Sequence, residues 1–199
     1  MDGERDVDDR QRRLVLTAGG AVGLAAAVAS VVPFVKSMGP SERTKAAGAP
    51  VEVDISNLKS GQMLTVEWRG KPVWILSRTP EMLASLATVA PQLADPASER
   101  SIQPDACRNE ARSIRPEIMV ALGVCTHLGC SPKAKFGTGI ESGLDADWQG
   151  GFYCPCHGST FDLAGRVFKD KLAPSNLVIP PYRFAGDNRI IIGEEEEKA

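Results

Sequence analysis

The chain has 199 residues, which suits one domain of about 150 residues together with one additional segment. Its 23 lysine and arginine side chains nearly balance its 25 aspartate and glutamate side chains, and the formal net charge is −2. This balance argues against a nucleic-acid partner, because such a partner requires a concentrated basic surface. The additional segment lies at the amino terminus.

The amino-terminal segment predicts a membrane anchor. Residues 1–13 are dense in charge of both signs and predict a cytoplasmic tail, and residues 14–36 predict a transmembrane helix. Leu14–Val35 carries no charge over 22 residues, which is about 33 Å of helix and enough to cross the hydrocarbon core. The alternative is a cleaved signal peptide with a small-residue site at Ala27–Ala29, but the apolar run continues past that site.

Two arginines precede the apolar run. Arg12 and Arg13, followed by leucine and valine, are similar to a twin-arginine export signal, and the alternative is a plain basic flank on the cytoplasmic side. Both interpretations place the amino terminus in the cytoplasm and the carboxyl-terminal domain in the periplasm, across a bacterial inner membrane. A disulfide can persist in that outer compartment.

Residues 37–50 have the composition of a flexible hinge or tether, and residues 51–199 predict a β domain. The tether reaches roughly 45 Å when fully extended, which would let the domain move relative to its anchor. Within the domain, a hairpin is predicted where Met63–Trp68 and Val73–Leu76 flank the turn Arg69–Pro72.

Thr79 and Pro80 predict the start of a helix that ends before Pro91, and a long polar loop continues from there to Arg115. Short strands with tight turns predict an all-β fold, an antiparallel sandwich in which two cysteine-rich motifs are loops at one end. The other expected strands are Val51–Ile55, Ile118–Val124, Leu177–Ile179, Tyr182–Phe184 and Arg189–Ile192.

The two motifs contain nearly all the soft metal ligands of the chain. Residues 125–130 read CTHLGC and residues 154–159 read CPCHGS, and together they hold both histidines and four of the five cysteines. Buried thiols with satisfied histidines are one interpretation of this clustering. A tetrahedral Cys2His2 zinc site is another, but it would leave Cys130 and Cys156 without a role.

Both motifs resemble those of Rieske iron-sulfur proteins. The resemblance implies one 2Fe-2S cluster in which Cys125 and Cys154 hold one iron while His127 and His157 hold the other. Neutral imidazoles in place of two thiolates leave the oxidised cluster without a net negative charge, so that it accepts an electron more readily.

The resemblance gives the two histidines a catalytic role. The ring nitrogen of His127 or His157 that does not bind iron keeps a proton, whose acidity depends on the charge of the cluster. Electron and proton uptake are therefore expected to be linked at one exposed ring. In quinol-oxidising members of the family, the resemblance further implies a disulfide between Cys130 and Cys156.

Further positions take their expected roles from the resemblance. Ser159 is expected to donate a hydrogen bond to a cluster sulfur, and Leu128 and Pro174 are expected on the surface that docks at the quinol pocket. Phe161 replaces a tyrosine that many relatives carry, which is expected to lower the potential. Lys169–Lys171 precedes Pro174 where relatives often have a Gly-Pro-Ala-Pro loop, so that loop is expected to differ in shape.

The resemblance extends over nearly the whole chain and is to Rieske subunits of bacterial ubiquinol-cytochrome c oxidoreductases. It implies one-electron transfer from ubiquinol to a c-type cytochrome, with a proton on a histidine ligand and a contribution to proton translocation. The implied partners are a cytochrome b subunit and a c-type cytochrome in a dimeric membrane complex. The alternatives are a Rieske ferredoxin of an oxygenase, a subunit of a plastoquinol-oxidising complex and a subunit of a periplasmic oxidase.

Two features have no place in this interpretation. Cys107 lies outside both motifs in the polar loop and is expected to be a free thiol. Glu194–Glu197 is expected to be a solvated tail rather than a binding site.

Overall fold

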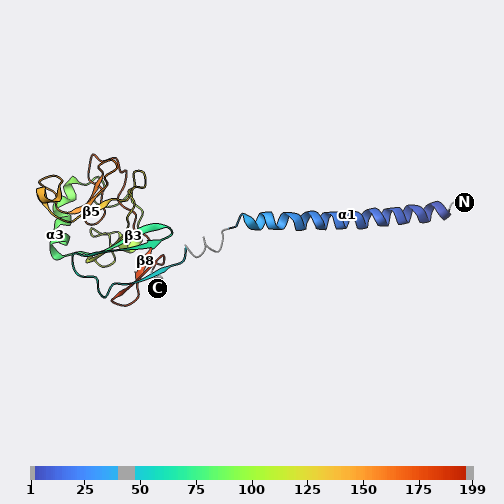
Figure 1. The fold of residues 1–199 in the computed structure, drawn as a ribbon, viewed down its shortest axis with the longest axis horizontal. Coiled ribbons are helices and arrows are strands. Elements are labelled where there is room, and N and C mark those ends of the chain that lie inside the picture. Colours follow the sequence, from blue (N-terminus) through green and yellow to red (C-terminus); the bar gives the residue numbers. More distant parts are fainter. Residues whose placement is uncertain (1–2, 40–47, 196–199) are drawn as a thin grey trace. The chain divides into compact units, whose positions relative to one another are not determined.

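The computed structural model describes residues 3–39 and 48–195, and the chain divides into two compact units, Met1–Ala46 and Ala47–Ala199. The first unit contains helix α1 (Gly3–Ser37), drawn in blue in Figure 1. Asp9–Ser37 is long and apolar enough to span a membrane. Most of the predicted tether, residues 40–47, lies outside the described residues, as do residues 196–199 of the predicted acidic tail.

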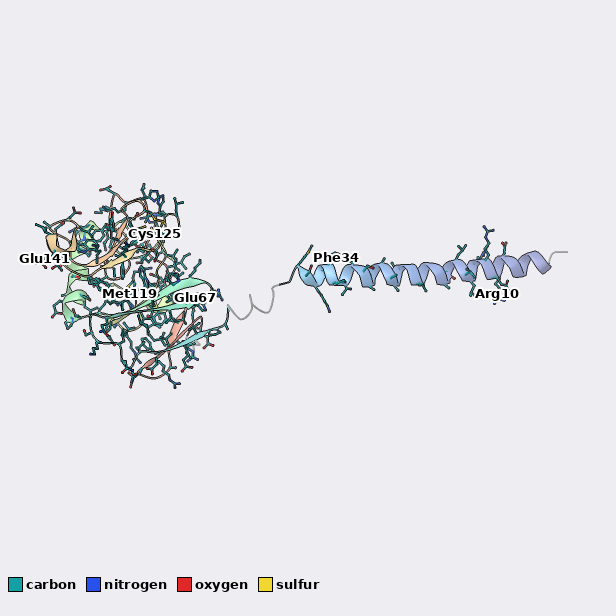
Figure 2. All side chains as sticks on the ribbon, in the orientation of Figure 1. Arg10, Phe34, Glu67, Met119, Cys125 and Glu141 are labelled. Carbon is teal, nitrogen blue, oxygen red and sulfur yellow. A yellow bond between two sulfur atoms is a disulfide. The ribbon has the colours of Figure 1, made fainter. Side chains whose placement is uncertain are left out.

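The side chains of α1 support a role as an anchor within the first unit. Leu16, Leu24 and Phe34 are all more than 60% exposed, and Phe34 projects from the helix in Figure 2. A helix that leaves large apolar side chains exposed needs nonpolar surroundings, which the lipid core supplies. The helix begins before residue 14, so residues 3–13 of the predicted tail are also helical.

The second unit contains three antiparallel sheets of three strands each, which confirms the predicted all-β antiparallel fold. Their strand orders are β1-β9-β8, β2-β3-β4 and β5-β6-β7, and Figure 1 shows β3 between β5 and β8. The strands are β1 (Val51–Asp54), β2 (Met63–Trp68), β3 (Lys71–Ser77), β4 (Ile118–Leu122), β5 (Lys133–Lys135), β6 (Gly151–Tyr153), β7 (Thr160–Phe161), β8 (Tyr182–Phe184) and β9 (Arg189–Ile192).

The β2–β3 hairpin has a tighter turn than predicted. Only Arg69 and Gly70 form the turn, and both have positive φ, 53° and 70°. Two left-handed residues match the twist of the flanking strands in a two-residue hairpin. Lys71 and Pro72 therefore belong to β3, where they pair with Trp68 and Glu67.

The predicted helix is confirmed as α3 (Pro80–Val89), with Pro80 in its first turn. The Thr79 hydroxyl caps it by accepting a hydrogen bond from the backbone N–H of Met82 at 3.2 Å. Leu86 and Val89 are its buried residues. Short 3₁₀ helices follow at η1 (Ala90–Gln92), η2 (Asp105–Cys107) and η3 (Gly139–Ser142).

The prediction of a strand at Leu177–Ile179 is wrong, because the structure has no strand there. Each of its residues bonds to a different part of the chain: Leu177 N–H to the Gly165 carbonyl, Ile179 N–H to the Ile102 carbonyl, and the Val178 carbonyl to Leu122 N–H. A ladder needs consecutive bonds to one neighbouring strand, and these three bonds do not share one.

The polar loop after α3 packs against the segment that follows the second motif. Ala94 N–H donates to the Val167 carbonyl, and Lys169 N–H donates to the Gln92 carbonyl. The Asn176 amide donates to the carbonyl of Asp95 at 2.9 Å. The loop is therefore part of the framework beneath the two motifs, although its sequence is polar.

Candidate metal centre

The first motif begins three residues after the fully buried strand β4, and Figure 2 places Cys125 beyond Met119 of that strand. The second motif joins β6 to β7. The ring of Trp74 in β3 stacks on Phe152 in β6, with centroids 4.7 Å apart. This contact fixes the sheet that carries the second motif against the sheet that carries the first.

The two motifs have the same backbone hydrogen bonds. In the first, Cys125 N–H donates to the Cys130 carbonyl and Gly129 N–H donates to the Cys125 carbonyl. In the second, Cys154 N–H donates to the Ser159 carbonyl and Gly158 N–H donates to the Cys154 carbonyl. Each motif is thus a closed loop of six residues with its first cysteine at the base.

A glycine in the fifth position makes each closure possible. Gly129 has φ 81° and Gly158 has φ 74°, which is the left-handed region that glycine occupies without strain. The sequence has glycine as the fifth residue of both motifs, and this repeat indicates that the two loops share a backbone conformation, which the spacing of cysteine and histidine does not show.

The free thiols lie inside and the imidazoles lie outside. Cys125 and Cys154 are free cysteines, 3% and 2% exposed. Burial raises the pKa of the Cys125 thiol. The rings of His127 and His157 meet edge to face with centroids 4.7 Å apart, and His127 is half-buried whereas His157 is exposed.

The remaining two cysteines of the motifs form a disulfide, Cys130–Cys156, which links the two loops. Both of its sulfur atoms lie within 4.8 Å of the Cys154 sulfur. A disulfide sulfur is a poor metal ligand compared with a thiolate, so Cys154 is the member of this group that could bind a metal. The donors left at the ends of the two loops are two thiols and two imidazoles.

A third segment covers the two loops. The Thr126 hydroxyl donates to the Ser175 carbonyl at 2.6 Å, and Ala173 N–H donates to the Ser159 hydroxyl at 3.1 Å. Ser159 is 1% exposed, and a hydroxyl that accepts one hydrogen bond can still donate another. Pro174, between the two contacts, is exposed.

Apolar side chains are exposed around this end of the unit. Leu128 in the first loop is 71% exposed, as expected, and Leu172 beside the covering segment is 59% exposed. The sequence reasoning did not select Leu172 or Thr126. The signal available for Leu172 was its position two residues before Pro174.

Phe161 is fully buried in β7, where it pairs with Phe152 of β6. The site of the hydroxyl that a tyrosine would carry is therefore inside the protein. Cys107 is free, as expected, but it is fully buried, with its thiol 3.7 Å from the Tyr182 hydroxyl. Burial raises the pKa of this thiol, so Cys107 is a core residue rather than a reactive one.

Buried arginines beneath the loops were also missed by the sequence reasoning. Arg78, Arg112 and Arg166 are 3%, 0% and 1% exposed. Arg166 forms an ion pair with Asp162 at 2.7 Å. Burial lowers the pKa of Arg78 and of Arg112 to about 10, which keeps both guanidinium groups charged at neutral pH.

Comparisons with known proteins show which family this chain is similar to. The family model described as "Rieske [2Fe-2S] domain" matches residues 102–182. The ubiquinol-cytochrome c reductase iron-sulfur subunit of Allochromatium vinosum is 54% identical over 97% of this chain and 93% of that protein. The protein of the same name from Rhodospirillum rubrum is 44% identical over 89% and 86%. Among solved structures, a chain of "Hyperthermophilic respiratory Complex III" is 24% identical with a TM-score of 0.49, over 88% and 98%.

The donor set fits the cofactor that the family model names. Two buried thiols with two histidines outside them match a cluster ligated by both residue types, and the disulfide accounts for the two cysteines that a zinc site leaves unexplained. The chain therefore belongs to the family of ubiquinol-cytochrome c reductase iron-sulfur subunits, and its Rieske domain carries one [2Fe-2S] cluster.

Proposed function

We propose that this chain is the electron-transfer subunit of a bacterial ubiquinol-cytochrome c reductase and carries single electrons from ubiquinol to a c-type cytochrome. Cys125 and Cys154 hold one iron of the cluster, and His127 and His157 hold the other. When bound, the cluster supplies a one-electron acceptor of raised potential, because imidazoles replace two thiolates. The observation that carries the proposal is the pair of free, buried thiols beneath two adjacent imidazoles.

The exposed histidine sets where the substrate enters. His157 is exposed and His127 is half-buried, so His157 is the ring that meets ubiquinol. When its outer ring nitrogen has lost its proton, that nitrogen accepts a hydrogen bond from the quinol hydroxyl, and it takes the proton as the electron leaves the quinol. The same ring releases that proton to the periplasm when the electron passes to the cytochrome, which contributes to proton translocation.

The surface around His157 suits docking into another protein. Leu128, Leu172 and Pro174 are exposed on the first loop and on the segment that binds both loops, and an apolar patch at this place would suit an interaction site. We assign this surface to a quinol pocket in the cytochrome b subunit. Excluding water there prevents water molecules from replacing the quinol as the hydrogen-bond partner of His157.

The first unit places the domain in the complex. Helix α1 anchors the chain in the inner membrane with its amino terminus in the cytoplasm, and Arg12 and Arg13 act as a twin-arginine signal for export of the folded domain. Residues 37–50 form the tether that lets the domain reach the cytochrome b subunit and then the c-type cytochrome. The complex is a dimer.

EPR spectroscopy of reduced membranes tests this function. We expect a spectrum with the low average g value of mixed nitrogen and sulfur ligation, and a shift of that spectrum when an inhibitor occupies the quinol site. A signal that no quinol-site inhibitor shifts would contradict quinol oxidation and favour the subunit of a periplasmic oxidase. A spectrum of all-sulfur ligation would contradict the two histidine ligands.

A further inference from the structure

Five charged side chains are buried in the described part of the second unit, and their charges do not cancel. Arg78, Arg112 and Arg166 are positive, and Asp95 and Asp162 are negative. Arg166 and Asp162 neutralise each other in an ion pair of 2.7 Å. The Asp95 carboxylate accepts from the backbone N–H groups of residues 99 and 100 and from the Ser101 hydroxyl.

Arg112 and Arg78 are held by neutral oxygens. Arg112 donates to the carbonyls of Ala164, Gly165 and Leu177 at 3.1, 3.3 and 2.8 Å. Its Nε donates to the side chain of residue 103 at 2.8 Å.

Arg78 donates to the carbonyls of Ala111 and Leu163 at 2.9 and 3.2 Å and to the Ser113 hydroxyl at 2.7 Å. Among the described side chains, no carboxylate forms an ion pair with Arg78 or Arg112. Both guanidinium groups are therefore buried positive charges without a countercharge in contact.

Both guanidinium groups converge on the segment that follows the second cluster loop. Their shared target, residues 163–165, begins four residues after Ser159, so the two positions are at most about 14 Å apart along the chain. Leu177, the other target of Arg112, lies four residues after Ala173, whose N–H binds the Ser159 hydroxyl. The two charges thus contact the segment that continues from the second loop, and Arg112 also contacts the segment that continues from Ala173.

Burying an unpaired charge costs stability, and a hydrophobic side chain of similar volume is often better tolerated. The charge also has an electrostatic effect at a distance, because buried charges interact through a low dielectric and are weakly screened by salt. At a pH where no histidine ligand takes up a proton, reduction adds one negative charge to the cluster. A fixed positive charge nearby therefore favours the reduced form.

We propose that Arg112, assisted by Arg78, raises the midpoint potential of the cluster through its buried positive charge. The proposal rests on the cluster ligation proposed above. Arg112 positions the covering segments through its hydrogen bonds, and its positive charge separately raises the midpoint potential of the cluster. These two roles separate when its charge and its hydrogen bonds are changed one at a time.

Redox titration of the full-length chain, followed by EPR of the reduced cluster, separates them. Arg112→Met removes the charge and should lower the midpoint potential. Arg112→Lys keeps the charge but loses several hydrogen bonds, so it should lower the melting temperature while leaving the potential close to that of the wild type. Arg100→Met removes an exposed charge from the same loop and should change the potential only at low ionic strength, whereas the Arg112→Met shift should persist in high salt.

Two more variants keep the test decisive if Arg112→Met does not accumulate. Arg78→Met should lower the potential in the same direction, and Asp95→Asn, which removes a buried negative charge, should raise it. An unchanged potential in these variants with an unaltered EPR spectrum would overturn the proposal, as would an equal fall in Arg112→Lys and Arg112→Met. Absence of the mixed-ligand EPR signal in the wild type would instead overturn the ligation.

Discussion

The two cluster loops share the same backbone hydrogen bonds, but their side chains make different contacts. In each, the first residue is a buried cysteine, the fifth is a left-handed glycine, and the same pair of backbone hydrogen bonds closes the loop. The disulfide cysteine, however, is the last residue of the first loop and the third residue of the second. The common backbone gives the first cysteine and the glycine equivalent places in both loops, whereas the histidines differ, because His127 is the third residue of its loop and His157 is the fourth.

The remaining positions divide the work between the loops. In the first loop, the Thr126 hydroxyl is used to bind the covering segment, and His127 is half-buried. In the second loop, the Ser159 hydroxyl accepts a hydrogen bond from that segment, and His157 is exposed. We infer that the first loop mainly secures the site and the second mainly meets the electron donor.

The shared backbone predicts equal and complete effects when the first cysteine of either loop is removed. Cys125→Ala and Cys154→Ala should each abolish the EPR signal of the cluster, because under the proposed ligation each removes one thiolate ligand of the same iron. Cys107→Ala is the matched control: it removes a buried thiol outside both loops, and the signal should remain. Iron and sulfide analysis of the purified full-length chain checks the result. A signal retained by either loop variant would show that its cysteine is not a ligand.

The disulfide predicts the next largest effect. Its cysteines are 26 residues apart, and the chain-entropy model gives about 3.5 kcal/mol for a loop of that length. Cys130→Ala and Cys156→Ala should each lower the melting temperature of the domain, and the double variant should lower it no further, because either change removes the whole cross-link. Calorimetry of the oxidised protein measures this. Additive losses in the double variant would mean that the two cysteines stabilise the loops separately.

The sequence alone was sufficient for the parts of the site that depend on residue type and spacing. The loops at residues 125–130 and 154–159, the capped helix from Pro80 and the antiparallel strands all follow from local patterns that the structure keeps. The expected strand at Leu177–Ile179 failed because its pattern is that of a strand while its hydrogen bonds go to three separate segments. The sequence around Leu177–Ile179 does not indicate which three segments it will contact.

The burial of Arg78 and Arg112 could not be predicted from the sequence for the same reason. Arg78 and Arg112 look like ordinary polar residues at the edge of a helix and in a polar loop, and only the tertiary fold buries them against residues 163–165. The polar composition of the loop from residue 93 to 115 also gave no sign that it packs beneath the cluster loops. Composition reports the preference of a side chain for water, and it does not report whether carbonyl oxygens replace that water.

The hydroxyl groups of Ser159 and Thr126 test whether the second loop tunes the cluster while the first loop stabilises the site. Ser159→Ala removes the buried hydroxyl that we propose as a donor to a cluster sulfur, and it should lower the midpoint potential of the cluster. Thr126→Val removes a hydroxyl already bound to the Ser175 carbonyl and should cost about 1 kcal/mol of stability with the potential nearly unchanged. Redox titration and thermal unfolding of both variants separate the effects. A larger fall in potential for Thr126→Val would reverse the assignment of duties.

The two glycines test whether the loops are equivalent in backbone alone. An added Cβ meets no atom within 4 Å at either Gly129 or Gly158, so Gly→Ala at each should cost only the left-handed strain of about 1 to 2 kcal/mol. At Gly151, by contrast, an added Cβ would strike the Phe161 carbonyl oxygen, and Gly151→Ala should cost more. Denaturant unfolding measures all three. Unequal losses at Gly129 and Gly158 would show that one loop is held more rigidly than the other.

Cys107 provides the smallest effect and a reference thiol outside both loops. Burial raises its pKa in the folded state, so above the ordinary thiol value of about 8.5 the unfolded chain loses a proton that the folded chain keeps. The unfolded state then binds fewer protons, and stability should fall as the pH rises through that value. The fall should be smaller in Cys107→Ala, with urea unfolding between pH 7.5 and 9.5 as the measurement. An identical pH dependence in both proteins would place the alkaline loss elsewhere, with the buried Tyr182 hydroxyl, whose pKa burial also raises, as the next group to change.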